Sequence, residues 1–469
     1  MTRQTNHPTS STRDAGSSSD KRIILSKVML ILSVLCILLA VGVWGFSVLA
    51  PQISASPVSP PPHDQKGATA TNNLDASTQA KALATQYMQA FIKQDYKSMW
   101  SLLHPQIQNK WTDETSFAAF LQKHFQDYTL QSFTIGQAST QAYWINPETM
   151  EQYNQIEKLP VSLILQLKPT PKQNLLPPED VHPAQIFQNL PFIAQQITPI
   201  GKKDKQWVVL AGGPADPEAP VLPPVTPPSK TVQVPILMYH YISDVPANDP
   251  NPALRLSLSV GPKQFTQQMD YLKQKGFHTI TLNELMDALY YDAPLPSKPI
   301  ILSFDDGYID AYQNAYPILK AHGFSGMFYI ITGKVGWQGQ MNWVQMREML
   351  ANGMQIGSHT IHHVDMGDTY LASPTVAQQE AQLSKITLEK NLGVLIQHFC
   401  YPNGGPFKRG SLALRAEVVS LLASDGYVSA TTDPGMTGTL QNSLTPLAML
   451  RIRVDGRASL LNFAQSLPG

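Results

Sequence analysis

Three patterns of hydrophobic and polar positions divide the chain. Residues 28–50 are an apolar run without a charge. Residues 76–212 first place apolar residues at helical spacing, at 77–94 and 117–125, and then alternate as strands do, at 129–135, 160–167 and 206–210. From residue 232 to 469, short apolar runs alternate with helical stretches that end at glycine. The first pattern predicts a membrane-spanning helix, the second a small α+β domain and the third an α/β domain.

The alternation over 232–469 predicts the strands of one mostly parallel sheet. The expected strands are 234–239, 299–304, 326–331, 355–357, 398–401, 428–431 and 447–454. The helices between them stop at glycines, which are common at helix C-termini. Six or seven such units in a segment of this length fit a single, distorted (β/α)7-type barrel. In such folds, reactive groups are carried at the carboxyl ends of the strands.

The apolar run at 28–50 is long enough to span a ~30 Å hydrocarbon core. Basic residues such as Lys27 precede it, and no Lys or Arg follows closely. By the positive-inside rule, the polar and disordered tail 1–27 is expected in the cytoplasm and the rest of the chain outside. The alternative is a cleaved signal peptide, although its apolar region is usually shorter, about 7–15 residues.

Composition separates the domains and limits the function classes. Residues 51–75 and 213–231 are rich in proline and read as linkers. The formal net charge is zero, which argues against a nucleic-acid partner. The cysteines are Cys36, inside the apolar run, and Cys400, so a disulfide framework is excluded.

A pair of carboxylates, Asp305 and Asp306, comes directly after the expected strand 299–304 and precedes a glycine. Adjacent acids at a strand end repel each other and lose hydration unless a cation lies beside them. Because successive residues of an extended chain point opposite ways, one Asp could bind a divalent metal while the other acts as general base. The alternative is a helix N-cap with a solvated neighbour.

Three of the twelve histidines, His359, His362 and His363, lie within five residues. His359 and His363 are four residues apart, so both imidazoles would reach one metal from a helical turn. With one Asp they make a three-ligand site with open positions, as catalytic Zn²⁺ and similar metals need. The alternative is a chance pair of structural histidines.

Two weaker signals lie at other expected strand ends. The strand 398–401 breaks at Pro402-Asn403-Gly404, where a backbone N–H group could donate to a developing oxyanion. Taken alone, this run is only a turn. His240 follows the first strand of the domain, and a lone histidine in such a position is more often structural.

Together these motifs resemble the polysaccharide deacetylase family (carbohydrate esterase family 4, the NodB-homology domain) over 232–469. The FDDG run at 304–307 is similar to the family's first motif, HTxxH at 359–363 to its second and FxYPNG at 399–404 to its third. The chain most resembles the subgroup that deacetylates poly-N-acetylglucosamine. Residues 76–212 faintly resemble the nuclear transport factor 2-like fold.

The resemblance implies a role for each motif residue. Asp305 would be the general base, His240 would protonate the leaving amine, and the Asn403 backbone N–H would help to hold the oxyanion. A divalent metal, with Zn²⁺ expected, would be the cofactor. Its ligands would be Asp306, His359 and His363.

Two departures from the family pattern matter. Cys400 and Asn403 stand where the third motif usually carries an Arg and a Tyr, of which the Arg orients the catalytic Asp. That role is left open, with Arg451 and Arg453 as candidates. The usual late His motif is also missing, because no His follows Val454. His240 is therefore the remaining general-acid candidate.

The sequence as a whole predicts a membrane-tethered, extracellular, metal-dependent N-deacetylase of an exopolysaccharide or cell-wall polysaccharide containing N-acetylglucosamine. One alternative is an esterase that removes O-acetyl groups from a polysaccharide. Another is a polysaccharide-binding protein of the same fold that has lost turnover, which the missing Arg keeps open.

Overall fold

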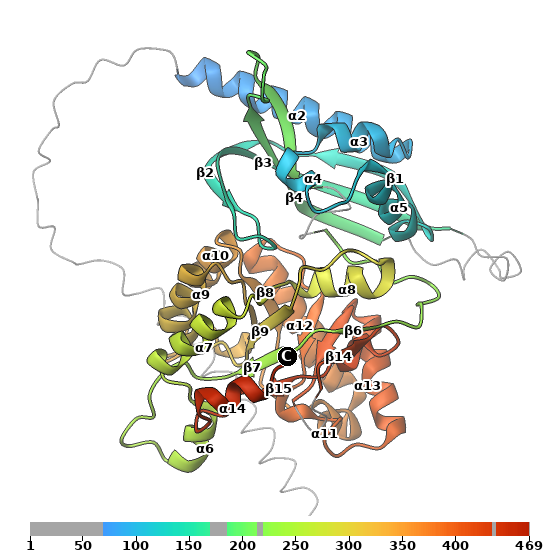
Figure 1. The fold of residues 1–469 in the computed structure, drawn as a ribbon. Coiled ribbons are helices and arrows are strands. Elements are labelled where there is room, and N and C mark those ends of the chain that lie inside the picture. Colours follow the sequence, from blue (N-terminus) through green and yellow to red (C-terminus); the bar gives the residue numbers. More distant parts are fainter. Residues whose placement is uncertain (1–68, 169–184, 213–218, 434–437, 469) are drawn as a thin grey trace, which may run out of the picture. The chain divides into compact units, whose positions relative to one another are not determined.

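The computed structural model of the chain describes residues 69–168, 185–212, 219–433 and 438–468 (Figure 1). In these ranges, no helix combines the length and the apolar character needed to cross a membrane. The span expected at 28–50 lies outside the described residues, as do the tail before it and most of the linker after it. The anchor therefore stays a prediction.

The amino-terminal described part is made of helices followed by an antiparallel sheet. Its helices are α2 (Thr69–Ile92), α3 (Tyr96–Leu102), α4 (Pro105–Gln108) and α5 (Glu114–His124). Its strands are β1 (Tyr128–Ile135), β2 (Ser139–Ile145), β3 (Gln152–Leu167), β4 (Gln185–Ile197) and β5 (Gln206–Ala211). They pair in the order β1-β3-β4-β5, with β2 on β3. Sequence patterning found β1, β5 and part of β3, but it missed β2 and β4.

The carboxyl-terminal described part is built on a parallel sheet. Its strands are β7 (Ile236–Tyr239), β8 (His278–Thr279), β9 (Pro299–Phe304), β10 (Met327–Ile330), β11 (Gln355–Ser358), β12 (His398–Cys400), β13 (Ser429–Thr431) and β15 (Ile452–Arg453). The order is β13-β12-β11-β10-β9-β7-β15, with β8 on β9, and neighbouring strands are parallel. All carboxyl ends of these strands therefore lie at one edge of the sheet.

Helices connect the strands and lie around the sheet (Figure 1). They are α6 (Pro252–Leu258), α7 (Pro262–Gln274), α8 (Leu282–Tyr291), α9 (Tyr316–His322), α10 (Trp343–Ala351), α11 (Met366–Ala372), α12 (Pro374–Leu392), α13 (Leu412–Ser424) and α14 (Leu460–Gln465). A short antiparallel ribbon joins β6 (Thr231–Gln233) to β14 (Leu440–Asn442). The result is an α/β fold with a curled parallel sheet.

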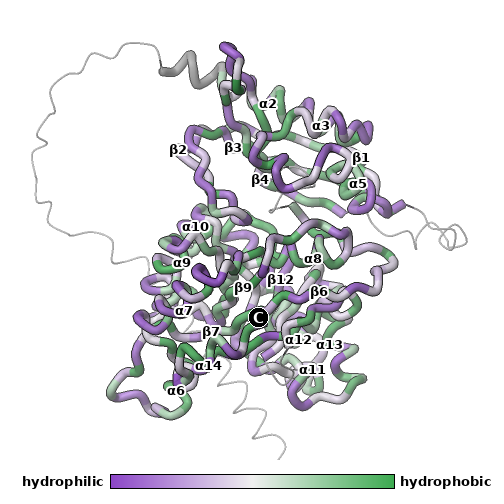
Figure 2. Tube along the Cα trace, viewed as in Figure 1, coloured by the Kyte–Doolittle hydropathy of each residue, from purple (hydrophilic) through white to green (hydrophobic). Residues whose placement is uncertain are grey.

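Hydrophobic sequence explains this layering. All four residues of β7 and of β10 are buried, as expected for parallel strands covered on both faces. The outer helices change between hydrophobic and hydrophilic along their length (Figure 2), because one face packs on the sheet and the other meets solvent. The aromatic rings of Phe304 and Phe328 stack inside this core, with centroids 4.7 Å apart.

The segment 449–454 bonds to both edges of the curled sheet. The Met449 backbone N–H donates to the Ala430 carbonyl at 2.8 Å, beside β13. At the other end, the Val454 N–H donates to the Met238 carbonyl of β7 at 3.1 Å. The strand expected over 447–454 is thus too long. Its first residues belong to a 3-10 turn, Pro446–Ala448, and only Ile452–Arg453 form the paired strand β15. This segment brings residue 451 to the inside of the sheet.

Candidate functional site

The tandem acids leave β9 at its carboxyl end, as their position in the sequence predicts. The Asp305 N–H still donates to the Tyr239 carbonyl of β7, at 3.0 Å, and so continues the sheet. The chain then turns sharply, because Asp306 and Gly307 both have φ +73°. A left-handed conformation at Asp306 costs free energy for a residue with a Cβ, and such residues concentrate at functional sites. The turn sends the two carboxylates to different partners.

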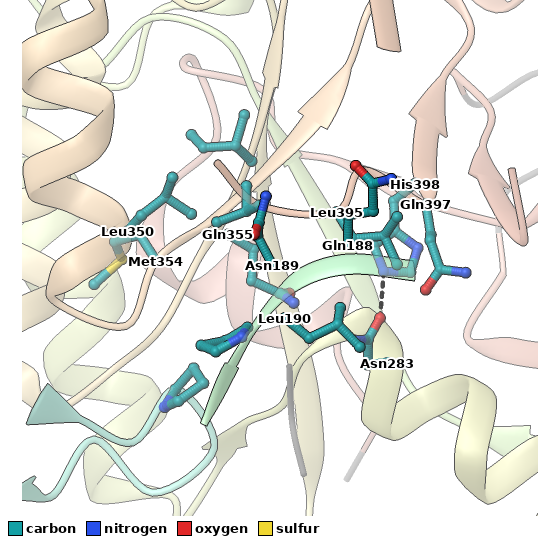
Figure 3. A pocket seen from close by; sticks show the side chains of 14 residues that line it. Gln188, Asn189, Leu190, Asn283, Leu350, Met354, Gln355, Leu395, Gln397 and His398 are labelled. Carbon is teal, nitrogen blue, oxygen red and sulfur yellow. Dashed lines mark hydrogen bonds between the residues drawn. The ribbon is translucent and has the colours of Figure 1, made fainter. Parts of the chain in front are cut away.

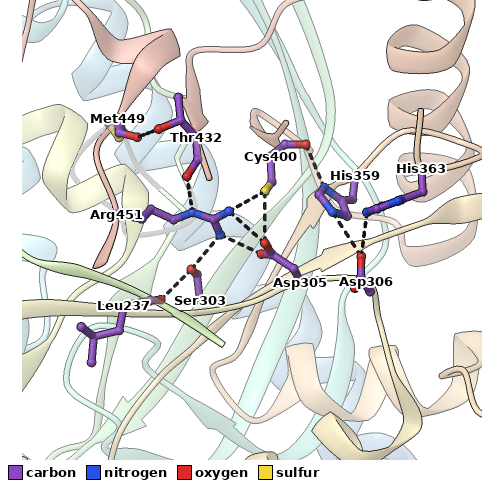
Figure 4. Close-up of polar contacts among 10 residues, drawn as sticks. All are labelled: Leu237, Ser303, Asp305, Asp306, His359, His363, Cys400, Thr432, Met449 and Arg451. Atoms are coloured by element: carbon purple, nitrogen blue, oxygen red, sulfur yellow. Dashed lines mark hydrogen bonds and ion pairs between the residues drawn. The ribbon is translucent and has the colours of Figure 1, made fainter. Parts of the chain in front are cut away.

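Asp306 faces both histidines of the second motif (Figure 4). Its Oδ1 atom lies 3.4 Å from His359 Nε2 and 3.1 Å from His363 Nε2. One ligand atom from each of the three residues lies within 4.8 Å of the other two. The structure thus brings together the residues that the sequence proposed as metal ligands, and their role as ligands stays a prediction.

The hydrogen bonding of this cluster fits a cation. His359 Nδ1 lies 2.8 Å from the Cys400 carbonyl, to which it can only donate. In a neutral imidazole, Nε2 would then present a lone pair to the Asp306 carboxylate. Asp306 Oδ1 is itself buried without a hydrogen bond in the described part of the chain. Two acceptors that face each other need a proton or a metal between them, and the donor set of one carboxylate and two imidazoles suits Zn²⁺.

The pKa directions agree with a site that gathers negative charge. Burial alone would raise the pKa of Asp306, but the close contacts with His359 and His363 hold it well below its ordinary value. Burial alone would lower the pKa of His359, but Cys400, Asp306 and Asp305 raise it well above the ordinary value. The cluster therefore attracts positive charge, whether a proton or a metal ion.

The expected helical turn between the two histidines is wrong. Residues 359–363 form an irregular loop after β11, in which Thr360 has φ +63° and His363 φ +62°. The Thr360 hydroxyl accepts from the His363 N–H at 2.9 Å and fixes the loop. The intervening His362 is not part of the cluster, because its Nδ1 pairs with Glu380 at 2.6 Å and its side chain is mostly exposed.

The second acid, Asp305, is held by an arginine from the end of the chain. Arg451 Nη1 and Nη2 each lie 2.8 Å from one carboxylate oxygen of Asp305, a bidentate pair (Figure 4). Arg451 is fully buried and also donates to the Thr432 carbonyl at 2.6 Å and to Ser303 Oγ at 3.3 Å. Burial alone would raise the pKa of Asp305, but Arg451 lowers it below the ordinary value. Asp305 is therefore ionised at neutral pH.

The sequence left Arg451 and Arg453 as candidates for the arginine that orients Asp305. In the structure, Arg451 makes this pair. Arg453 instead donates to Ser257 Oγ at 3.3 Å. Cys400, at the motif position where an Arg is usual, lies between the groups, with Sγ 3.2 Å from Arg451 Nη2 and 3.6 Å from Asp305 Oδ2. A small side chain at 400 thus leaves room for the guanidinium of Arg451, which comes from the segment directly before β15.

His240 lies after β7, close enough to the acids for both to act on it. Burial lowers the pKa of His240, and the charges of Asp305 and Asp306 oppose that effect without overcoming it. Asn403 is exposed in the loop after β12 and has φ +56°. All predicted site residues therefore lie at the carboxyl edge of the sheet, and the roles of His240 and Asn403 stay predictions.

Sequence reasoning missed two tyrosines beside the cluster. The rings of Tyr241 and Tyr308 stack with centroids 3.9 Å apart. Burial and the nearby Asp306 raise the pKa of the Tyr308 hydroxyl. The signal was present in the sequence, because Tyr241 directly follows His240 and Tyr308 follows the Asp-Asp-Gly run.

A cavity at the opposite edge of the sheet holds none of these residues (Figure 3). Gln355 and His398, the first residues of β11 and β12, line it together with Asn283. His398 Nε2 donates to Asn283 Oδ1 at 2.7 Å. In parallel α/β folds chemistry is carried at the carboxyl ends of the strands, so this cavity is not the candidate active site.

The site defines an α/β protein with an arginine-held carboxylate next to a candidate metal centre. A family model described as polysaccharide deacetylase matches residues 292–420. The chain is 31% identical over 227 residues to YxkH of Bacillus subtilis (strain 168), a protein assigned to the polysaccharide deacetylases; the match covers 48% of this chain and 73% of YxkH. The chain therefore belongs to the polysaccharide deacetylase family, and the resemblance stated from its motifs is confirmed.

Other relatives are more partial matches. The chain is 29% identical over 159 residues to the poly-beta-1,6-N-acetyl-D-glucosamine N-deacetylase of Staphylococcus aureus (strain MSSA476). That match covers 31% of this chain and spans about half, 54%, of the relative. Among solved structures, the Streptococcus pyogenes deacetylase PplD in complex with acetate is 30% identical, with a TM-score of 0.44, and covers 52% of this chain and 100% of that chain.

Proposed function

We propose that residues 232–469 are a metal-dependent hydrolase that removes N-acetyl groups from a polysaccharide containing N-acetylglucosamine. The observation that carries the proposal is that the two adjacent acids, Asp305 and Asp306, have different partners. Asp306 Oδ1 faces His359 and His363, while both carboxylate oxygens of Asp305 are paired with Arg451. One acid is therefore placed to bind a cation and the other to accept a proton.

Asp306, His359 and His363 would hold the metal, with Zn²⁺ expected from the donor set. A bound divalent cation supplies positive charge that acidifies an attacking water and polarises the acetyl carbonyl. Asp305 takes the proton of that water, and Arg451 keeps its carboxylate ionised and oriented for this task. A backbone N–H in the exposed loop at Asn403 would donate to the oxyanion of the tetrahedral intermediate.

Breaking the amide needs a proton donor, because an amine leaves readily only when it is protonated. His240 is the candidate, since it lies at the same edge of the sheet and feels the charges of both acids. Burial lowers its pKa, so in the resting chain its imidazole is largely neutral at pH 7. It would therefore become a donor by gaining the one proton that Asp305 takes from the attacking water, which it would then pass to the leaving amine.

The missing motif arginine no longer favours a protein that has lost turnover. Arg451, which directly precedes β15, supplies a guanidinium to Asp305 and would take over the orienting role. The N-acetyl rather than O-acetyl substrate is supported by the Staphylococcus aureus relative, whose name specifies N-deacetylation of poly-beta-1,6-N-acetyl-D-glucosamine. We propose further that the run at 28–50 anchors the chain in the cell membrane with residues 51–469 outside the cell.

The test is acetate release by the purified protein. We expect release from N-acetylglucosamine oligomers, its loss on chelation, and its return with Zn²⁺. Asp305→Asn should lower the rate by roughly 10²–10⁴-fold, the range for loss of a general base. Faster release from acetylated xylan than from the oligomers would favour the O-acetyl esterase. Oligomer binding with no acetate release, or full activity of Asp305→Asn, would contradict the proposal.

The anchor is tested separately by cell fractionation. We expect the full chain to stay with the membrane fraction and to be degraded by protease added to intact cells. Soluble, processed protein in the medium would favour the cleaved signal peptide instead.

A further inference from the structure

The helix α12 carries a carboxylate on its buried face. The other buried residues of this helix are small or apolar: Ala377, Ala381, Ser384, Leu388 and Leu392. Glu380 lies among them and is only 6% exposed. A glutamate is almost never so buried unless it is paired, because burying its charge costs free energy. Glu380 takes no part in the proposed reaction, so its contacts must explain why it is there.

Glu380 is bonded to the ligand loop, residues 359–363, which begins and ends with a candidate metal ligand. Its Oε2 atom accepts from the backbone N–H of Ile361 at 3.0 Å and from that of His362 at 2.9 Å. Its Oε1 atom lies 2.6 Å from His362 Nδ1. One carboxylate therefore holds the middle of the ligand loop through two backbone groups and one ring.

The ligand loop needs partners of this kind. It is neither helix nor strand, so its backbone groups must find hydrogen bonds elsewhere. Thr360 and His363 have left-handed backbone conformations, which are uncommon for residues with a Cβ and persist where the surrounding contacts fix them. The Gly333 N–H donates to the Ile361 carbonyl at 2.9 Å. Glu380 fixes the N–H groups of the same stretch, so the loop is held through its donors and its acceptors.

The helix that carries Glu380 is itself fixed beside the ligand loop. The hydroxyl group of Ser384, one turn after Glu380, lies 2.9 Å from that of Ser358. Ser358 is the last residue of β11 and directly precedes the loop. The Tyr427 hydroxyl donates to the Ala381 carbonyl of the same helix at 2.9 Å. The carboxylate therefore belongs to a packed helix, as is usual for the outer groups that orient metal ligands.

We propose that Glu380 is a positioning residue that holds the ligand loop in its metal-binding shape before a metal arrives. The inference rests on the proposed function, because it assigns Glu380 to the same metal centre. Glu380 acts through the backbone of Ile361 and His362 and touches neither the metal nor the substrate. Fixing that backbone fixes where the imidazoles of His359 and His363 point.

Two replacements separate the geometry of Glu380 from its charge. Glu380→Gln removes the charge but keeps the length of the side chain and an oxygen that accepts from both N–H groups. Glu380→Asp keeps the charge but is one methylene shorter, so it cannot reach both. Competition with a chelator of known affinity measures zinc binding by the purified chain. We expect zinc affinity to fall less than about 3-fold in Glu380→Gln and about 10–100-fold in Glu380→Asp and Glu380→Ala, as when other outer partners of metal ligands are removed.

The opposite order would overturn the proposal. If Glu380 acted on the metal only through its charge, Glu380→Asp would keep the zinc affinity and Glu380→Gln would lose it. Should Glu380→Ala not fold, the comparison of Glu380→Asp with Glu380→Gln decides the matter.

Hydrogen exchange in the metal-free chain gives a readout that depends on neither zinc nor activity. In the wild type, the amide hydrogens of Ile361 and His362 should be protected, because each is donated to a buried carboxylate. In Glu380→Asp and Glu380→Ala, their exchange should become about 5–10-fold faster, which corresponds to the loss of roughly one hydrogen bond. Unchanged exchange in both variants would contradict a loop that is held before the metal binds.

Glu389 on the same helix provides the matched control. Its carboxylate also accepts a backbone N–H, that of Ile396 at 3.1 Å, and pairs with Lys385 at 2.7 Å. Ile396 precedes β12 and so lies at the amino edge of the sheet, away from the ligand loop. Glu389→Ala should lower the melting temperature and keep the wild-type zinc affinity. A merely structural Glu380 would behave in the same way, with a lower melting temperature and unchanged zinc binding.

The two proposals fail in different ways. If the wild type neither binds zinc nor releases acetate, the proposed function is wrong and the role of Glu380 falls with it. If the wild type does both, but Glu380→Asp loses no more zinc affinity than Glu389→Ala, the metal centre stands and the positioning role is wrong.

Discussion

Two buried histidines at opposite edges of the parallel sheet differ in almost everything except burial. His359 follows β11 and is 2% exposed, while His398 begins the neighbouring strand β12 and is 5% exposed. Acidic groups raise the pKa of His359 well above its ordinary value against the effect of burial. Burial lowers the pKa of His398 to about 3.

The two pKa shifts differ because the ring nitrogens of the two histidines face different groups. His398 accepts from Ser429 Oγ at 2.8 Å and donates to Asn283 at 2.7 Å, so its neutral ring is fully paired. His359 donates from Nδ1 to a carbonyl, and its Nε2 then faces the Asp306 carboxylate. One ring completes a structural network, and the other leaves a place for a cation. A buried histidine alone therefore does not indicate a metal site. The groups that face its two ring nitrogens distinguish a structural histidine from a candidate ligand.

The largest difference in activity should come from replacing each of the two histidines, His359 and His398, with glutamine. His359→Gln removes a proposed ligand, so acetate release should fall by about 10³-fold or more, since a catalytic cation contributes several kcal/mol to the transition state. The zinc content of the purified protein should fall with it. His398→Gln is the matched control and should keep both the zinc and most of the activity. Equal losses in both variants would remove the distinction between the two edges.

Arg451→Lys tests whether Arg451 orients Asp305 and lowers its pKa. A lysine cannot form the bidentate pair, so the rate should fall by about 10–100-fold, as when other orienting partners in an active site are removed. Asp305 must be ionised to act as a base, and activity is lost as the pH falls through its pKa. Arg451 lowers that pKa, so in Arg451→Lys the acid limb of kcat/KM should move to higher pH.

The control for this shift is Arg453→Lys, two residues further on. Arg453 bonds Ser257 and not Asp305. The acid limb of kcat/KM in Arg453→Lys should therefore stay at the wild-type pH. An unshifted limb in Arg451→Lys would show that Asp305 is not the group that titrates in the free enzyme.

His398 should instead control stability against acid. Its pKa is about 3 in the folded chain and near 6.5 when unfolded, so the unfolded state binds more protons between these values. Unfolding free energy is therefore lost as the pH falls below about 6.5, by about 2 kcal/mol at pH 5 from this group. In His398→Gln, the difference in unfolding free energy between pH 7 and pH 5 should shrink by that amount. Denaturant titration measures it, and an unchanged difference would contradict a neutral buried ring.

The smallest effect is expected at Cys400. Its Sγ touches Arg451 and Asp305, but the bidentate pair does not depend on it. Cys400→Ser keeps a small polar group that can still make part of the contact, so kcat/KM should change less than about threefold, or about 0.7 kcal/mol, near the lower end of the about 0.5–1.5 kcal/mol that a neutral contact contributes. A loss as large as that of Arg451→Lys would mean that the thiol itself positions the base.

Much of the reaction edge could be predicted from sequence because parallel strands bring their carboxyl ends together. Asp305, Asp306, His359 and His363 each follow an apolar run, and the structure places them at one edge. The choice between Arg451 and Arg453 could not be made, because residues two apart on a strand share a face. Only the irregular path of 449–454 separates them.

Other features had no readable signal. The loop from 359 to 363 depends on left-handed residues that are not glycine, and few such residues occur in proteins. Strand β4 was missed because glutamine, asparagine and proline interrupt its apolar positions. The cavity lined by Gln355 and His398 depends on how distant segments pack, which periodicity does not encode.

The pairing of Asp305 with Arg451 joins residues 146 positions apart, and the arginine directly precedes β15. A chain emerging from the ribosome or threading through a translocation channel would carry its acids and histidines long before the guanidinium that fixes the base. A truncated product that stops before residue 451 would keep Asp306, His359 and His363 and yet lack the guanidinium that pairs with Asp305, so under the proposed mechanism we expect it to be inert toward polysaccharide.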